Sequence, residues 1–185
     1  MVQVWLPQLR KVRRISEPLP DDSWFGANFT QGDMKLRLPI DENHEIIETT
    51  LFNSCAQGIK ISKKSQWHSY TQNQVPCMSK GKEVFVLKSR PSAEYPANYD
   101  YRISYIDTKT YADYRTEYYE NNKLVKEIEK NWLPAGMPMP RAQTFSHWYV
   151  KDHRTSSESL LIMMPLEKKS YPKMWTDSFL RKTKR

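Results

Sequence analysis

The sequence YRISYIDTKTYADYRTEYYENNKLVKEIE, residues 101–129, decides the fold. Its side chains alternate between two sets over three stretches, which are separated by Asp-Thr-Lys-Thr at 107–110 and by Asn121-Asn122. Alternation with a period of two is typical of β-strands, and asparagine tolerates the positive φ angles of a tight hairpin turn. The segment therefore predicts three consecutive antiparallel strands.

The same alternation continues on both sides of this segment. EVFVLKS at 83–89 predicts a strand, and residues 46–52 predict a strand or a short helix. Beyond a proline-rich loop at 133–142, residues 142–150 and 156–164 predict another hairpin. The sequence offers none of the crossover helices that a parallel sheet needs. We therefore expect an antiparallel meander of about six strands.

The fold class that follows is mainly β, within the α+β group. A strongly curved antiparallel meander of this kind is expected to form an incomplete barrel. Near the end of the chain, Thr176 caps DSFLRKT at 177–183, which predicts a short C-terminal helix. Large side chains are predicted to share one face of their strand: Tyr99, Tyr101, Ile103 and Tyr105 in one strand, and Tyr114, Thr116 and Tyr118 in the next.

The chain opens on a pattern that also predicts a strand. In MVQVWLPQLRKVRRI, residues 1–15, valine and leucine alternate with glutamine and tryptophan before Pro7, and a basic cluster follows. We expect this strand to belong to the sheet, and the strands that precede it there to be absent from this chain. Residues 1–185 are accordingly interpreted as a single domain that forms the C-terminal part of a longer one.

The net charge of +8 is concentrated at the two ends of the chain. Residues 1–14 and 181–185 each carry four basic side chains and no acid, and the residues between them are balanced. A nucleic-acid groove would show basic residues interleaved with aromatic ones across the fold, so we expect no nucleic-acid partner. Solvated termini explain the charge, and peripheral contact with an anionic membrane surface is the functional alternative.

The sequence contains no constellation typical of catalysis. It has no HExxH motif, nucleophile elbow or Walker loop, and only 5 glycines. Since no nucleophile–base pair can be named, we expect neither an enzyme nor a metal or cofactor site.

Cys55 and Cys77 are the only cysteines. Two thiols do not make a structural zinc site. Their spacing permits a disulfide in an oxidising compartment, and two buried free cysteines explain the sequence equally well.

Three segments, in order, resemble a known family. WLPQLRKVRRIS at 5–16 and DDSWFGANFTQGD at 21–33 resemble a segment of bacterial outer-membrane lipoprotein-sorting proteins of the LolA-like group. The meander at 101–129 and the ending MWTDSFLRK at 174–182 are similar to later parts of that family. The resemblance runs from Trp5 to about Leu180.

The resemblance implies a periplasmic protein with a LolA/LolB-like fold, in which helices cover a hydrophobic cavity of a half-barrel. It implies carriage of acyl chains, without catalysis or cofactor, and a signal peptide that this chain does not contain. Two departures are Asn121-Asn122-Lys123, where the family often has a glycine, and the insert LPAGMPMP.

The leading hypothesis is a periplasmic carrier that binds the acyl chains of a lipid or lipoprotein in a hydrophobic concavity. Its partners would be an inner-membrane transporter or an outer-membrane receptor. The alternative is a non-catalytic protein-interaction module that works with a membrane transporter. The side chains predicted to line the concavity are Trp5, Phe25, Tyr101, Ile103, Tyr105, Tyr118, Trp148 and Met163.

Overall fold

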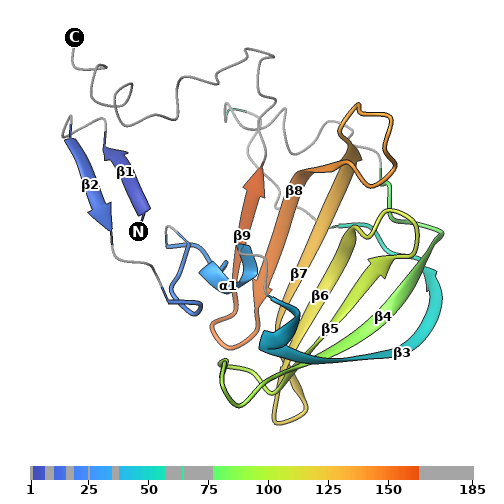
Figure 1. The fold of residues 1–185 in the computed structure, drawn as a ribbon, viewed down its shortest axis with the longest axis horizontal. Coiled ribbons are helices and arrows are strands. Elements are labelled where there is room, and N and C mark those ends of the chain that lie inside the picture. Colours follow the sequence, from blue (N-terminus) through green and yellow to red (C-terminus); the bar gives the residue numbers. More distant parts are fainter. Residues whose placement is uncertain are drawn as a thin grey trace.

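A computed structural model of the chain describes residues 2–6, 11–15, 19–24, 26–34, 38–56, 64 and 77–162, the first two ranges as backbone only. Its main element is a seven-stranded sheet in the order β3-β4-β5-β6-β7-β8-β9 (Figure 1). The strands are β3 (Glu42–Phe52), β4 (Lys82–Pro91), β5 (Tyr101–Asp107), β6 (Asp113–Glu120), β7 (Lys123–Pro134), β8 (Gln143–Asp152) and β9 (Ser157–Ile162).

Each strand of this sheet pairs antiparallel with the next one along the chain, so the sheet is a meander. Within the described residues β3 and β9 form its two edges, and the sheet curves without closing (Figure 1). The predicted fold class, a mainly β incomplete barrel, is confirmed. Residues 46–52 are part of a strand rather than a helix. The C-terminal helix predicted at 177–183 lies outside the described residues.

The first two strands form a separate sheet. β1 (Val2–Leu6) pairs antiparallel with β2 (Lys11–Ile15), with Val4 opposite Arg13. The first strand thus pairs with the basic segment that follows it, and not with a strand of the meander as expected. Val12 and Ile15 have high β propensity. The segment that the sequence presents as a basic cluster is therefore also a strand.

One face of the large sheet is covered by residues 23–24 and 26–34, which include the short helix α1 (Gln31–Met34). Thr30 and Asp33 form reciprocal side-chain-to-backbone hydrogen bonds at the start of α1, as in a capping box. Asp33 then contacts Tyr118 and Lys126 of the sheet. We call this covered side of the sheet the inner face, and the opposite side the outer face.

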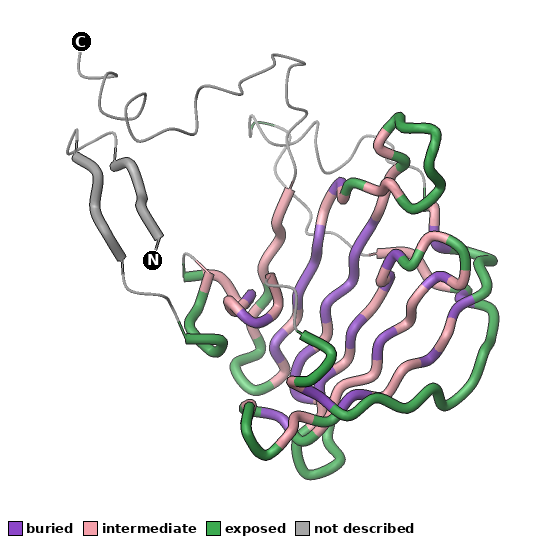
Figure 2. The backbone as a smooth tube through the Cα atoms, in the orientation of Figure 1, coloured by how far each residue is buried: buried purple, intermediate pink, exposed green. Residues whose placement is uncertain are grey.

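The burial of the strands is uneven (Figure 2). Buried positions alternate along β6, and four consecutive positions of β7, 128–131, are buried, whereas the nine positions from Asn43 to Leu51 of β3 are exposed. Two apolar clusters hold the fold together, one between α1 and the inner face and one near the end of β3. The first contains Phe29, Tyr99, Tyr118, Val125, Ile128, Trp148 and Val150, and the second Phe52, Val84, Ala112 and Tyr114.

Bulges in the ladder shift some side chains to the other face from the one predicted. The register shifts where β5 meets the start of β6, and a bulge of this kind interrupts strict alternation. As a result Tyr114 packs on Phe52 at a ring-centroid distance of 5.7 Å, away from Tyr118. Tyr99 precedes β5, so it packs on Tyr118 at 5.0 Å instead of sharing a face with Tyr101. Both one-face predictions therefore need this correction.

Candidate functional site: two adjoining cavities

The larger cavity lies at the end of the sheet where β3, β5 and β7 finish. Its volume is about 730 Å³, and we call it the end cavity. Its apolar lining comes from Leu51 of β3, Trp132 of β7, and residues of the two flanking connections: Met78, Pro134, Met137, Pro138, Met139 and Pro140.

The segment that joins β7 to β8 forms one wall of the end cavity. A pair of backbone bonds closes this segment: Ala135 N–H donates to Ala142 O at 2.9 Å, and Ala142 N–H donates to Met139 O at 2.9 Å. Between them Gly136 has φ of +74°, a left-handed conformation that glycine adopts without strain. Met137 and Met139 are consequently held with 62% of their surface exposed.

The connection between β3 and β4 forms the opposite wall. Cys55 and Cys77 are joined by a disulfide, with their Cα atoms 5.6 Å apart. The Ser79 hydroxyl donates to Ser54 O at 2.8 Å, and Gly81 N–H donates to Phe52 O at 2.7 Å. These links fix both ends of the connection beside the cavity, and with them the position of Met78.

The polar rim of the end cavity is electrically balanced. Its charged side chains are Lys82, Lys109, Glu83 and Asp107. Burial disfavours the charge of Asp107, but the Thr110 amide, the Tyr114 hydroxyl and the Lys109 amide all donate to its carboxylate, so its pKa lies below the usual range. Asp107 is therefore an anion already satisfied by its own turn.

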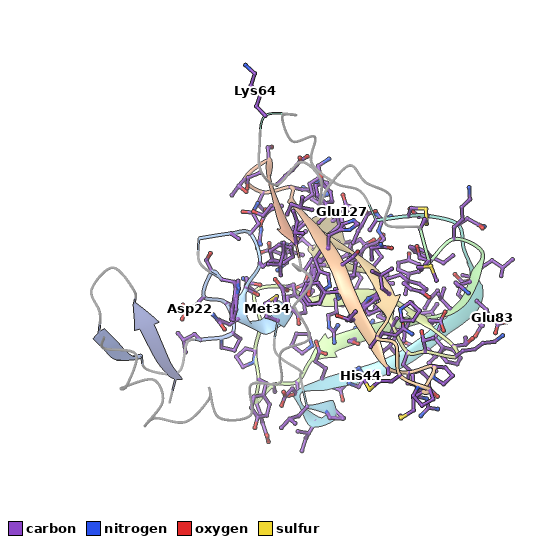
Figure 3. All side chains as sticks on the ribbon, turned by 90° about the horizontal axis from the view of Figure 1, so that it is seen from above. Asp22, Met34, His44, Lys64, Glu83 and Glu127 are labelled. Atoms are coloured by element: carbon purple, nitrogen blue, oxygen red, sulfur yellow. A yellow bond between two sulfur atoms is a disulfide. The ribbon has the colours of Figure 1, made fainter. Side chains whose placement is uncertain are left out.

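The second cavity lies on the inner face beside α1. Its volume is about 450 Å³, and we call it the inner cavity. Thr110, Trp132 and Gln143 line both cavities, so the two adjoin. Glu83, at the end cavity, and Met34, at the inner cavity, are labelled in Figure 3.

Ion pairs, rather than apolar side chains alone, form much of the inner-cavity wall. The Arg102 guanidinium donates to both carboxylate oxygens of Glu42, and Lys130 donates to Asp113 and to the Thr116 hydroxyl. Burial alone would lower the pKa of Arg102, but the bonds to Glu42 raise it above its ordinary value. A neighbouring carboxylate neutralises the charge of each of these two cations.

A third ion pair attaches α1 to the sheet. Lys126 Nζ lies 2.8 Å from Asp33 Oδ2, and the Tyr118 hydroxyl donates to Asp33 Oδ1 at 2.8 Å. Burial disfavours the Asp33 charge, but Lys126 outweighs it and holds the pKa of Asp33 below its usual range. Burial and the Asp33 charge raise the pKa of Tyr118 well above 10. Asp33 is thus the charged contact between α1 and the sheet.

The structure divides the predicted site residues between the two faces. Tyr118 and Trp148 both line the inner cavity. Tyr101, Ile103 and Tyr105 lie on the outer face, because the residues opposite them in the antiparallel ladder are Tyr119, Glu117 and Arg115, which interact with one another there. Tyr101 stacks on Tyr119 at 4.9 Å, and Tyr105 packs on Phe52. The structure describes only the backbone of Trp5, and Phe25 and Met163 lie outside the described residues.

The sequence reading missed most of the residues that line the cavities. Met137 and Met139 belong to the insert LPAGMPMP, and their residue type suits core filling as well as an apolar ligand, so it does not by itself assign them to a cavity. Its alternation of methionine and proline was the available signal, since such a segment has apolar side chains but no strand or helix in which to bury them. The paired charges of the inner face gave no comparable signal.

No group of His, Cys, Asp and Glu side chains in the described part of the chain could hold a metal ion. A search of the same residues finds no helix long and apolar enough to cross a membrane.

Comparisons with known proteins support one fold. No protein-family model matches the chain, and no curated protein matches its sequence. Among solved structures, a domain named as an outer membrane lipoprotein-sorting protein from Vibrio parahaemolyticus superposes with a TM-score of 0.58 at 17% identity. The chain has a LolA-like fold. This confirms the fold that the sequence resemblance implied.

Two further solved structures are similar to the chain. A DUF1329 family protein from Desulfovibrio piger gives a TM-score of 0.58 at 16% identity, and a LolA superfamily protein from Nitrosomonas europaea gives 0.47 at 12%. The superpositions cover 97% of this chain for the Vibrio domain and 96% for the other two. The chain spans 65%, 63% and 66% of their respective lengths.

Proposed function

We propose that this protein is a non-enzymatic periplasmic carrier that binds an acyl chain of a lipid or lipoprotein in the end cavity. The observation that carries the proposal is the end cavity itself, about 730 Å³, with methionine and proline side chains along one wall. Its volume falls within the roughly 300–1,000 Å³ of small-molecule sites. Met137, Met139 and Leu51 are exposed beside it.

The physical reason is the cost of apolar surface in water. Each methylene of an acyl chain gains about 0.8 kcal/mol on leaving water, and the exposed methionines gain from the same contact. Methionine is unbranched and polarisable, so it adapts to chains of different length and saturation. A wall of Met137 and Met139 therefore suits a cargo that varies in its acyl composition.

Two further observations support the proposal. A domain of the same fold is named for outer membrane lipoprotein sorting. The Cys55–Cys77 disulfide beside the cavity fits an oxidising compartment, such as the bacterial periplasm.

The test is binding of a fluorescent fatty acid to the purified protein, with native mass spectrometry of protein isolated from a bacterial periplasm. We expect uptake, and at least a tenfold loss in a Met137→Gln/Met139→Gln variant, because polar amides replace the apolar wall. Ile46→Gln is the matched control, since Ile46 is 58% exposed on β3 and does not line the cavity. Equal binding by all three proteins, or no uptake at all, would sink the proposal.

The exposed edge β3 favours a second candidate, an interaction module that works with a membrane transporter. Strand addition to an open edge is a common way to bind a partner, and Ile46, Ile47 and Leu51 are exposed there. The test is amide hydrogen exchange of the wild-type protein with and without solubilised inner-membrane proteins. Their addition should slow the exchange of the β3 amides. Unchanged exchange rates in β3 would exclude this candidate.

A further inference from the structure

The two cavities differ in net charge. The charged residues of the end cavity are two lysines and two acids, which cancel. The inner cavity is lined by Arg102, Lys130 and Arg141 against Asp33 and Asp113. Glu42 pairs with Arg102 and Lys126 pairs with Asp33, so including these two partners leaves the inner cavity with one surplus positive charge.

Arg141 is the source of the surplus charge. Arg102 and Lys130 each contact a carboxylate, whereas no carboxylate among the described residues pairs with Arg141. Its contacts are with Tyr111: the guanidinium carbon lies 4.5 Å from the ring centroid, and Nη2 lies 3.4 Å from the hydroxyl oxygen. Apart from the donor of Nη2 that faces the Tyr111 hydroxyl, this stacked guanidinium has N–H donors that can bind a planar anion.

The position of Arg141 is as informative as its charge. It lines the inner cavity, while Pro140 before it lines the end cavity and Gln143 lines both. Tyr111, on which it stacks, has φ of 59°, a left-handed conformation that is costly for a bulky side chain. The Tyr111 amide bonds to Asp107 O at 3.0 Å, which helps to hold the conformation. Strain of this kind is often retained at ligand sites.

We propose that the ligand is an anionic amphiphile whose acyl chain lies in the end cavity and whose carboxylate or phosphate binds Arg141 where the two cavities adjoin. This inference rests on the proposed function, because it places the head group of the same cargo. Guanidinium binds carboxylate and phosphate in the same bidentate geometry, so the shared chemistry is an anionic head group. The ion-paired Arg102 and Lys130 form the wall behind it.

The experiment compares amphiphiles that share a 16-carbon chain and differ in the head group. Palmitate, palmitoyl lysophosphatidate and neutral monopalmitoylglycerol are titrated below their micelle concentrations by displacement of a bound fluorescent probe. We expect wild-type protein to prefer the anionic ligands over the neutral one by about tenfold, the size of one charge-assisted interaction. The two anionic arms distinguish a carboxylate from a phosphate cargo.

Arg141→Gln should reduce this preference to within about twofold, with neutral binding unchanged, and Arg141→Lys should keep part of it. Lys123→Gln, at the opposite end of the sheet where β7 begins, is the charge-matched control and should bind like wild type. Arg141 is exposed, and equal melting temperatures of all variants check that the fold is intact. Added salt should weaken only anionic binding.

The outcomes separate the two proposals. Wild-type protein that binds neutral and anionic ligands equally overturns the head-group inference and leaves the carrier intact. A preference that survives in Arg141→Gln overturns the assignment to Arg141. Failure of every amphiphile to bind overturns the carrier proposal itself.

Discussion

The two adjoining cavities are lined by different kinds of side chain. The end cavity is walled by loop side chains, chiefly exposed methionine and proline, and contains no buried ion pair among its lining residues. The inner cavity is walled by strand side chains, and three buried or nearly buried ion pairs border it. The lining of the end cavity is mainly apolar, whereas the lining of the inner cavity contains charged side chains and part of α1.

This difference teaches where stability and binding reside in the molecule. The ion pairs of the inner face contribute little net stability as pairs, because each charge had to leave water, but removing one partner leaves a buried charge uncompensated. Met137 and Met139 of the end cavity belong to neither apolar cluster, and Arg141 of the inner cavity is exposed. Substitutions in the buried ion pairs should therefore act on folding, and substitutions of these exposed loop side chains on ligand binding.

The largest expected effect is the loss of the ion pair that holds α1. The side chains of Lys126 and Asp33 are only 5% and 1% exposed. Lys126→Ala should reduce the free energy of unfolding by about 3–5 kcal/mol, the usual cost of a buried charge without a partner. Urea denaturation measures it. The double variant Asp33→Asn/Lys126→Met should recover much of the loss, and a decrease below about 1 kcal/mol would show that the pair is solvated.

Loss of the disulfide should have the next largest effect, and it acts on the end cavity. The free energy of unfolding of a Cys55→Ser/Cys77→Ser variant should be about 2–4 kcal/mol lower than that of the wild type, because the unfolded chain gains conformational entropy. Acyl-chain affinity should also fall, since Met78 and its wall lose an anchor. Titrating wild-type protein in the presence of a reductant checks this independently. Unchanged affinity in both experiments would argue that the other links of that wall suffice.

Acid should weaken the inner face by a smaller amount. The pKa of Asp33 is lower in the folded protein than in the unfolded chain, so the folded state binds fewer protons. Its stabilising contribution is therefore present above the unfolded pKa of about 4, and is lost as the pH falls through the folded pKa. Denaturation midpoints between pH 2 and 7 would measure it. The same pH profile is measured for Asp33→Asn and subtracted from that of the wild type. The difference removes the contributions of Asp107 and Asp152, whose pKa values are also lowered.

The smallest effect on stability is expected at the end cavity. Met139→Gln changes an exposed side chain, and such changes usually stay within about 0.5 kcal/mol. The same substitution should reduce acyl-chain affinity several-fold, because part of the apolar wall is lost. Thermal denaturation and fatty-acid titration on one sample give both numbers. A large loss of stability with unchanged affinity would reverse the distinction between the two cavities.

The sequence could predict the sheet but not the distribution of side chains between its faces. Period-two alternation and Asn121-Asn122, whose φ angles are 50° and 59°, are local features, so the strands and their turn were predicted correctly. A bulge is set by packing across strands, which is why Tyr114 was assigned to the wrong face. The alternation rule applied to Tyr101, Ile103 and Tyr105 held, but it could not say which face α1 would cover.

Partners distant in the sequence were the other information that the sequence could not give. Asp33 and Lys126 are 93 positions apart, and nothing near either residue indicates that the two are paired. Tyr118 and Trp148 were predicted because large aromatic residues suggest a binding wall. Met137 and Met139 suit both core filling and contact with an apolar ligand, and nothing in the sequence decides between the two. The resemblance to a family predicted the fold, while the cavities required coordinates.

The connection between β3 and β4 has a consequence for how the protein can be extended. Cys55 and Cys77 are 22 positions apart in sequence and 5.6 Å apart at their Cα atoms. The disulfide and the bond from Ser79 to Ser54 hold the two ends of this connection together. A peptide or a small domain inserted between the two cysteines should therefore leave β3 and β4 in place and lie beside the end cavity.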